Sequence, residues 1–456
     1  MLDAKMVLIG GGSFGWSHKL VTDIACLPAL HGMHIVLQDI NPEPLEIVLP
    51  LCQKISAALD AKLRIEATTD LAAALPGADF VGLTISTAGE VGDELDHVIP
   101  ERYGILQTIG DTVGPGGWSR ALRNIPVVVD IVRSVERLAP NAWFMNYSNP
   151  MTVLTRAIRR TSSVKSVGLC HELQGLLLHM AYYFGVDWED DIKVQMGGIN
   201  HLIYIMSMDV KGQDGLRLLR DYKGDPNTFQ APPDHPVPEL LTNGGGVNPH
   251  QKIKLDMLRR TGMLTGAGDA HTAEFFSHYL RNETTLKAWG LASQRLAHTF
   301  AHGGSPADRR RVAEDLVNGR RPLWLMHSHE HASRIIAALL GLHDDLVTPV
   351  NLPNTGQIDN LPREAVVETQ AVVNGAGIQP MGVGTLPHIA TTHLMRHIPT
   401  QEMIAEAGLT GDRDLAVQAL ACDPLVPDPD TAEKIADDVF TEFRDWLPQF
   451  HGKWSC

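Results

Sequence analysis

The chain has 456 residues, of which 44% are hydrophobic and 20% are charged, and its formal net charge is −15. This composition excludes a disordered chain, and the length suggests two or three domains. The acidic balance disfavours nucleic acid and anionic lipid surfaces as partners. No apolar run is long enough to span a membrane, no export signal precedes the first strand, and the five cysteines are scattered without CxxC spacing. We therefore expect a cytoplasmic protein with free thiols.

Residues 6–40 have the order of elements that builds a dinucleotide site. An apolar strand at 6–9 precedes Gly-Gly-Gly-Ser-Phe-Gly at 10–15, which matches GxGxxG, and a helix is expected over about 16–30. A second strand over 34–39 ends in an acid that would bind the adenosine ribose hydroxyls and favour NAD over NADP. A merely structural glycine turn is the alternative. The residues assigned to the cofactor are Gly10, Gly12, Ser13, Phe14, Gly15, Asp39, Ser86 and Asn146.

Each glycine of this motif has a mechanical reason. Gly10 permits the tight turn, Gly12 lets the backbone approach a pyrophosphate, and Gly15 is expected to let the helix pack close to the strand. The positive N-terminus of the helix would face the phosphates.

Further buried strands are expected at 78–86, 142–147 and 164–169, separated by helical segments. This alternation predicts an α/β fold whose parallel sheet carries helices on both faces, with ligands beyond the carboxyl ends of the strands. Those ends carry Ser86-Thr87, the segment 146–150 and Cys170-His171-Glu172.

Beyond about residue 195 the sequence changes in character. The Pro- and Gly-rich segment 223–250 is expected to be a long loop, with a lid as one interpretation. Further predictions are helices near 251–261, 272–279 and 328–340, short strands and turns over 346–400, and a tail helix over 431–446. We predict a Rossmann-type dinucleotide-binding domain over 1–195 and a mixed α/β domain over 196–456.

One candidate metal site combines Cys170-His171-Glu172 with Asn200-His201, which follows two glycines. A thiolate would suit zinc, whereas a mixed site of sulfur, nitrogen and sugar oxygens can hold manganese. The alternative is that Cys170 is only a small buried apolar residue.

Two glycine loops and a His-rich run leave their roles open. The loop at 110–117, which holds Asp111 and precedes Arg120, is either a phosphate cradle or a tight loop whose aspartate caps the next helix. Asp269, in the loop 266–274, is either a helix cap or a general base. The run at 326–331 lacks HExxH spacing, and a polar helix start is favoured over a metal site.

Taken together, the ordered motifs resemble those of glycoside hydrolase family 4, the NAD-dependent glycosidases. The motifs are the glycine loop at 10–15, Asn149-Pro150, residues 168–172, residues 198–201, residues 350–354 with 360–362, residues 411–413 and residues 422–426. The resemblance implies a lactate/malate-dehydrogenase-like nucleotide domain joined to an α/β domain, in a homo-oligomer, either dimer or tetramer.

The resemblance also implies an unusual mechanism. NAD would oxidise C3 of the sugar, a base would remove the C2 proton while Mn2+ or another divalent metal stabilises the enediolate, and elimination, water addition and hydride return would follow. Cys170 and His201 would be the metal ligands. Asp269 is the candidate base, and Asp111 is the candidate acid or leaving-group organiser, with His171 and Glu172 as competitors. The residues expected to bind the substrate are Asn149, Arg120 and His271.

Two sequence details bear on the substrate. The pair Cys170-His171 departs from the Cys-Asp and Cys-Asn forms of the phospho-sugar members, and residues 268–275 look more like the uronide-cleaving branch. The expected substrate is therefore an α-glycoside of an unphosphorylated hexose or hexuronic acid. The alternatives are a lactate/malate-type 2-hydroxy-acid dehydrogenase and a non-enzymatic NAD-binding regulator.

Overall fold

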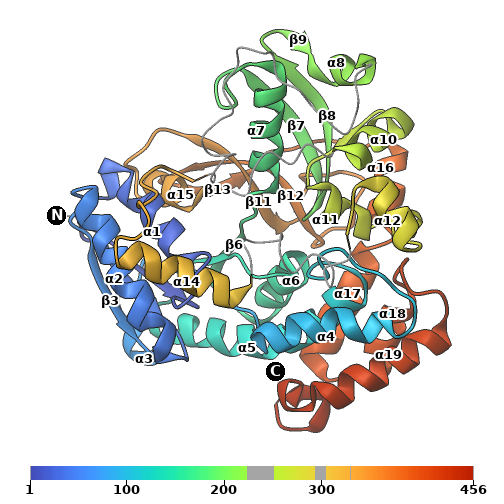
Figure 1. Cartoon of the computed structure of the whole chain (residues 1–456), viewed down its shortest axis with the longest axis horizontal. Coiled ribbons are helices and arrows are strands. Elements are labelled where there is room, and N and C mark those ends of the chain that lie inside the picture. The colour runs from blue at the N-terminus through green and yellow to red at the C-terminus, as the bar shows by residue number, and fades with distance from the viewer. Residues whose placement is uncertain (1, 223–250, 293–304, 329, 455) are drawn as a thin grey trace.

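The computed structural model describes residues 2–222, 251–292, 305–328, 330–454 and 456. Within these residues a 13-stranded sheet has the strand order β10-β8-β7-β12-β11-β6-β5-β4-β1-β2-β3, with β13 beside β12 and β9 beside β8. Figure 1 shows this sheet crossing the molecule from β3 at the left to β8 and β9 at the top, with helices on both sides.

Six parallel strands form the N-terminal half of the sheet, in the spatial order 3-2-1-4-5-6 that is typical of dinucleotide-binding folds. They are β1 (Lys5–Ile9), β2 (His34–Gln38), β3 (Arg64–Thr68), β4 (Phe80–Leu83), β5 (Trp143–Asn146) and β6 (Lys165–Gly168).

The remaining strands continue the sheet in antiparallel fashion. The junction between the two halves is a single pairing, between Gly168 of β6 and Asn351 of β11. The strands of this half are β7 (Ile192–Ile199), β8 (Leu202–Val210), β9 (Gln213–Asp214), β10 (Leu264–Thr265), β11 (Leu346–Pro353), β12 (Val366–Asn374) and β13 (Gly377–Pro380).

Helices cover the two faces of the parallel half because successive strand residues point to opposite sides. In β1, Met6 and Leu8 belong to one apolar cluster, while Val7 and Ile9 belong to another. The first cluster packs under α1 (Ser17–Ala25), α2 (Pro42–Ala58) and α15 (Ala332–Leu339), and α14 (Pro306–Val317) lies on α2. The second packs under α4 (Gly89–Glu101), α5 (Gly114–Leu138), α6 (Met151–Thr161), α17 (Ile398–Thr410), α18 (Arg413–Ala421) and α19 (Pro429–Glu442).

The antiparallel half has its own shorter helices. They are α7 (Glu172–Phe184), α8 (Gly215–Asp221), α10 (Lys252–Thr261), α11 (Asp269–Glu274), α12 (Glu283–Trp289) and α16 (His388–Leu394), and α3 (Leu71–Ala74) lies at the other end of the sheet. The 3-10 turns are η1 (Pro28–Leu30), η2 (Ser277–Tyr279), η4 (Arg444–Trp446) and η5 (Pro448–His451).

Most expected elements are confirmed, with shifted ends. The first helix stops at Ala25, before the 3-10 turn that begins at Pro28, and the tail helix runs over Pro429–Glu442. The expectation of only strands and turns over 346–400 is wrong, because α16 and the start of α17 lie there. The predicted loop or lid at 223–250 lies outside the described residues. The predicted domain boundary after residue 195 falls within β7 and stays a prediction.

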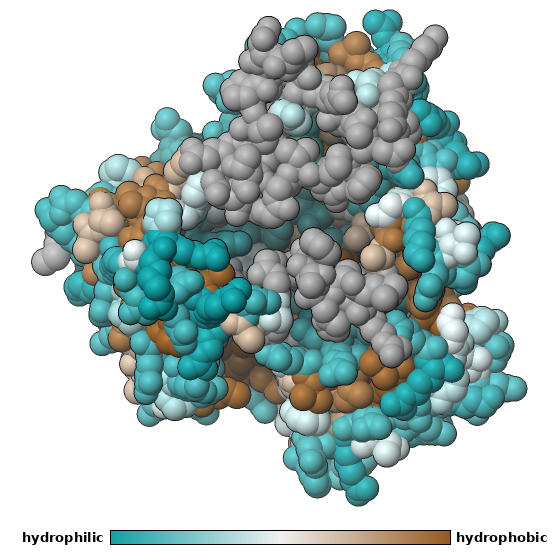
Figure 2. Space-filling view, viewed as in Figure 1, coloured by the Kyte–Doolittle hydropathy of each residue, from teal (hydrophilic) through white to brown (hydrophobic). Residues whose placement is uncertain are grey.

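In the described part of the chain, no helix combines the length and the apolar character needed to cross a bilayer. All five cysteines are free thiols, as expected. Figure 2 shows a largely hydrophilic face on which hydrophobic residues form separate patches.

Candidate active site

The glycine loop after β1 makes the tight turn that the sequence predicts. Gly10 has a φ of +83°, and a Cβ there would lie 2.3 Å from the carbonyl oxygen of Thr84, so only glycine fits. The Gly12 N–H donates to Asp39 Oδ2 at 2.9 Å, and Asp39 Oδ1 accepts from the Asn41 N–H at 3.0 Å. Asp39 therefore ties the loop to the end of β2, and each of its oxygens can accept a further hydrogen bond.

The role expected for Gly15 is wrong. A Cβ at Gly15 would meet only Cδ of Arg309, at 3.9 Å, so this glycine allows no close helix–strand contact. The close approach lies at Gly11 instead, where a Cβ would stand 2.8 Å from the Gln38 nitrogen. The following helix, α1, has no side-chain cap at its N-terminus. The Ser17 N–H, the first of this helix, already donates to the Ser13 carbonyl oxygen at 3.3 Å. The end of α1 therefore attracts an anion mainly through its partial positive charge.

Ser86 and Asn146 stand at the carboxyl ends of β4 and β5, where the cofactor was expected. Ser86 is exposed. Asn146 is buried, and its amide donates to the Ser148 carbonyl and accepts from the Ser148 N–H. The Asn146 side chain thus holds the turn before α6, and this geometry gives its predicted cofactor role no support.

His201 lies in the two-residue turn between β7 and β8 with a φ of 63°, a conformation that histidine tolerates better than most residues. Its Nδ1 lies 2.7 Å from Thr112 Oγ1, and that hydroxyl donates to Asp111 Oδ1 at 2.5 Å. Because the hydroxyl has one proton, Nδ1 of His201 must be the protonated nitrogen, which leaves the lone pair on Nε2 for a metal. Burial and neighbouring His271 lower the pKa of His201 to about 3, so the ring is neutral.

Asp111 is a fixed anion. Its second oxygen, Oδ2, accepts from Asn149 Nδ2 at 2.8 Å. Burial alone would raise the pKa of Asp111, but His271, Arg120 and the hydrogen bond from Thr112 outweigh it and hold this pKa well below its usual range. An ionised carboxylate cannot donate a proton, so the geometry favours an organising role over the acid role.

His271 joins two carboxylates to the His201 ring. Its Nδ1 lies 3.8 Å from Asp111 Oδ1, its Nε2 lies 3.9 Å from Glu172 Oε1, and its ring centroid is 3.9 Å from that of His201. Among the described residues, Asp111, His201 and His271 form a group whose potential ligand atoms all lie within 4.8 Å of one another. This group is the most metal-like arrangement in that part of the chain.

Glu172 and His171 extend the network away from this group. Glu172 Oε2 accepts from the Gly268 N–H at 2.6 Å, while Oε1 faces His271 and His171, both at 3.9 Å. Burial opposes ionisation of Glu172, but these histidines hold its pKa well below the usual range. His171 Nδ1 lies 3.0 Å from Glu330 Oε1. Burial alone would lower the pKa of His171, but Glu330 raises it to about 9.

Cys170 is in a different environment. Asn200 donates to its sulfur, and the carboxylates of Glu368 and Glu172 are its nearest charges. Burial, followed by these two carboxylates, raises the pKa of the Cys170 thiol well above its ordinary value. A nearby divalent cation would favour the thiolate. Cys170 does not belong to the group of Asp111, His201 and His271.

Glu368 of β12 is a buried carboxylate that the sequence analysis missed. Its Oε2 accepts from Nδ2 of Asn200 at 3.1 Å and of Asn351 at 3.2 Å. Burial raises the pKa of Glu368 to about 7. Glu368 thereby ties the His201 turn to the strand that joins the two halves of the sheet.

Asp269, the candidate base, holds the start of a helix. Its two oxygens accept from the N–H groups of Ile253 and Lys254 at 2.9 and 3.2 Å, and the Lys254 ammonium lies 3.5 Å away. Asp269 does not cap the helix that it begins, α11, but holds the first turn of a different helix, α10, so its role here is structural although not the cap that was predicted. The base assignment stays a prediction that the geometry does not support.

Buried carboxylates also hold the loop at 110–117. Glu274 Oε1 accepts from the N–H groups of Thr108, Ile109 and Gly110 at 2.9, 2.8 and 2.8 Å. Asp423 accepts from the Gly114 N–H at 2.9 Å. The interpretation that Asp111 caps the next helix is wrong, because α5 has no side-chain cap. The N–H groups of Gly110 and Gly114 are occupied by protein carboxylates, which gives the phosphate-cradle interpretation no support.

Arg120 lies close to this loop but is engaged elsewhere. Its side chain is 13% exposed, it pairs with Asp93, and its Nε lies 3.6 Å from Asp96. The substrate role predicted for Arg120 stays a prediction, as do those of Asn149 and His271. The run at 326–331 does precede a helix, α15, but its Glu330 also reaches the site through His171.

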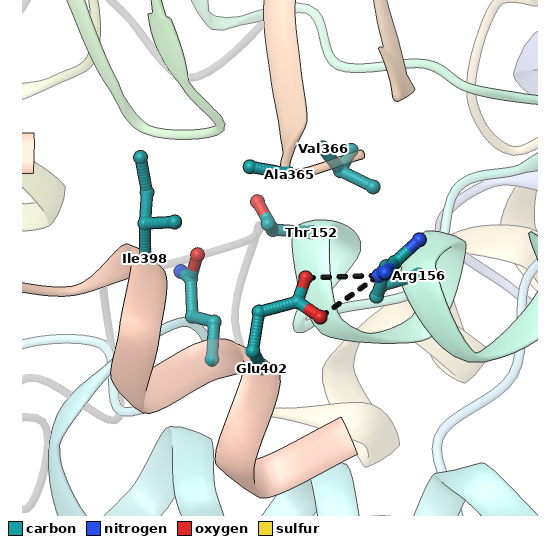
Figure 3. A pocket seen from close by; sticks show the side chains of 7 residues that line it. Thr152, Arg156, Ala365, Val366, Ile398 and Glu402 are labelled. Atoms are coloured by element: carbon teal, nitrogen blue, oxygen red, sulfur yellow. Dashed lines mark hydrogen bonds and ion pairs between the residues drawn. The ribbon is translucent and has the colours of Figure 1, made fainter. Parts of the chain in front are cut away.

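A small pocket lies at the junction of α6, α17 and β12 (Figure 3). Arg156 crosses it and pairs with Glu402 at 2.9 Å. None of its lining residues belongs to the histidine–carboxylate network. We therefore place the candidate active site at the histidine–carboxylate network and not in this pocket.

Comparison with known proteins identifies the family. A profile described as "Family 4 glycosyl hydrolase" matches residues 5–186, and one for the "Family 4 glycosyl hydrolase C-terminal domain" matches residues 196–426. The chain belongs to glycosyl hydrolase family 4. The dehydrogenase alternative is correspondingly less supported, and the resemblance stated from the sequence is confirmed.

Relatives within family 4 include an α-galacturonidase of Lachnoclostridium phytofermentans, 34% identical over 98% of this chain and 97% of that protein. The crystal structure of the putative glucosidase lplD from Bacillus subtilis superposes with a TM-score of 0.81 at 33% identity, covering 96% of this chain and 99% of that one. A 6-phospho-α-glucosidase from gut microorganisms, in complex with NAD and Mn2+, shares the fold at 19% identity, with a TM-score of 0.80 and coverage of 98% and 100%.

Removal of the Glu274 carboxylate tests how the Asp111 loop is held. We expect Glu274→Ala to lower the free energy of unfolding by at least about 3 kcal/mol, because three backbone donors lose their acceptor. Glu274→Gln retains an acceptor oxygen and should lose less. Urea denaturation measures both. The matched control is Glu314→Ala, which breaks a surface ion pair with Arg310 and should cost less than about 1 kcal/mol. Equal losses in Glu274→Ala and the control would contradict this account.

Proposed function

We propose that this family 4 protein hydrolyses the α-glycosidic bond of an unphosphorylated hexuronic acid with the help of NAD and a divalent cation. The preferred candidate substrate is an α-galacturonide, and the preferred candidate cation is manganese. The observation that carries the proposal is the close group of Asp111, His201 and His271 at the carboxyl edge of a dinucleotide-binding sheet. We choose this substrate because the relatives include α-galacturonidases and because residues 268–275 resemble the uronide-cleaving branch. A cytoplasmic location and a homo-oligomeric state stay predictions.

The chain offers residues that fit both NAD and a divalent metal ion. The glycine loop, with its uncapped helix N-terminus and Asp39, is a cradle for a dinucleotide. His201 offers a neutral Nε2 lone pair, and Cys170 offers sulfur from the end of β6, as the family resemblance implies. Bound NAD supplies a reversible oxidant for a sugar hydroxyl, and a bound divalent ion supplies a Lewis acid for the sugar oxygens.

We assign proton transfer to the pair formed by Glu172 and His271. Glu172 is ionised, and among the described residues the groups that face its Oε1 are the two imidazoles at 3.9 Å. Asp111 is immobilised by Thr112 and Asn149, so we assign it to orienting His271 and Asn149. We therefore propose that the Glu172–His271 pair takes the proton from the carbon next to the oxidised one.

The first test concerns the substrate and the metal. Hydrolysis of 4-nitrophenyl α-D-galacturonide should require NAD and Mn2+ and should stop with a chelator. Cys170→Ser should weaken Mn2+ binding, measured by electron paramagnetic resonance, while NAD binding measured by calorimetry persists. Chelator-resistant turnover would contradict the metal assignment.

A second test separates the two candidate bases. Glu172→Gln should lower kcat by about 10²- to 10⁴-fold at unchanged melting temperature, because the acceptor is lost. Asp269→Asn should instead lower the melting temperature, because a helix-end interaction is lost, while kcat per folded molecule stays within about tenfold of the unaltered value. The reverse pattern would restore Asp269 as the base.

The third test concerns cofactor choice. Asp39→Ala should weaken NAD binding, because the ribose partner and the anchor of Gly12 are both lost. It should also narrow the preference for NAD over NADP, because a negative charge that repels a 2′-phosphate is removed. Calorimetry in which the unaltered protein binds NADP as tightly as NAD would refute this assignment.

A further inference from the structure

Helix α14 presents three consecutive arginines, and only two of them have carboxylate partners in the described part of the chain. Arg310 pairs with Glu43 at 2.6 Å and with Glu314 at 3.0 Å, and Arg311 pairs with Asp308 at 3.2 Å. Figure 2 shows the strongly hydrophilic patch that covers α14. The third arginine, Arg309, has no carboxylate within ion-pair distance among the residues that the structure describes.

Several contacts fix α14 on the nucleotide-binding half. Ala313, 1% exposed, shares an apolar cluster with Leu51 and Ile55 of α2, and Phe14 of the glycine loop packs against the same cluster. At the other end of α14, Lys54 of α2 donates to the carbonyls of Leu316 and Val317, both at 3.1 Å. Figure 1 shows α14 lying alongside α2. These contacts hold α14 in place beside the glycine loop.

The same face of α14 carries Arg309. Arg309 precedes Ala313 by four residues, one helical turn, so both side chains lie on the side turned to the nucleotide-binding half. The Arg309 Cδ, next to the guanidinium, lies 3.9 Å from the position of a Cβ at Gly15. The Arg309 side chain therefore lies beside Gly15, where a close contact between helix and strand was expected.

Positive charge therefore gathers at the end of the glycine loop. The N-terminus of α1 begins two residues after Gly15, has no side-chain cap and has no acidic residue in its first turn. A helix N-terminus carries partial positive charge, so a guanidinium beside it is unfavourable unless an anion lies near both. Chemically, a phosphate is the anion that an arginine and a helix N-terminus bind together.

We propose that Arg309 is a phosphate-binding residue of the NAD site. Its guanidinium pairs with the pyrophosphate held at the N-terminus of α1, so a helix that follows residue 305 completes a site built by residues 10–39. This inference rests on the NAD part of the proposed function. It adds a cofactor contact from the part of the chain that the sequence analysis predicted to be a second, mixed α/β domain.

The test compares Arg309→Ala with a matched control, Arg311→Ala, which removes an arginine of the same helix whose ion pair is exposed. Binding of NAD and of ADP-ribose to each purified protein is measured by calorimetry, and binding of adenosine by competition against NADH fluorescence. Arg309→Ala should weaken NAD and ADP-ribose about tenfold to a hundredfold, because both ligands keep the two phosphates. Adenosine affinity should not change, and Arg311→Ala should bind all three ligands normally.

Two results would overturn the inference. Arg309→Ala could bind NAD and ADP-ribose as tightly as the unaltered protein, or it could lose adenosine in equal measure, which would place the guanidinium away from the phosphates. Unchanged melting temperatures confirm that a loss is local. An unaltered protein that binds no NAD would overturn the proposed cofactor as well, whereas tight NAD binding by both proteins overturns only the role of Arg309.

Discussion

Burial of charge at the carboxyl edge of the sheet is the constraint on which this site depends. An isolated buried carboxylate or imidazolium is costly, and the cost falls only when opposite charges alternate at short range. Here Glu330, His171, Glu172, His271 and Asp111 follow one another at 3.0 to 3.9 Å, and Thr112 joins Asp111 to His201. The alternation explains why His171 is held protonated, why Glu172 and Asp111 stay ionised, and why His201 at the end of the series is neutral.

The fold supplies these groups from distant parts of the chain. Cys170 and Glu172 follow the last parallel strand, His201 sits in the first antiparallel hairpin, Asp111 comes from the loop before α5, and His271 comes from α11. The Asp111 loop is held by further buried carboxylates that accept backbone N–H groups, Glu274 on residues 108–110 and Asp423 on Gly114. A continuous sheet joins the two halves, so the candidate metal site and the glycine loop proposed to hold the dinucleotide share one support.

The sequence predicts the parallel half of the fold well, because apolar strands, a glycine loop and a terminal acid are local signals. It also points to Cys170, His201, Asp111 and His271. It leaves the role of Asp269 open because a structural carboxylate and a catalytic one look alike until their partners are known, and the partners found here do not support the base role. Glu330, Glu274 and Glu368 were missed because their function lies in contacts with residues 159, 166 and 168 positions away. An acid inside the apolar strand at 366–374 was the one available signal for Glu368.

The most direct test of the account is hydrolysis of an α-galacturonide in deuterium oxide by protein stripped of nucleotide, with and without added NAD, analysed by NMR of the released sugar. A network that removes a proton next to an oxidised carbon predicts turnover only with NAD and deuterium at C2 of the product. Full turnover without NAD, with the original proton retained at C2, would show direct displacement and would contradict the proposed chemistry of Glu172 and His271.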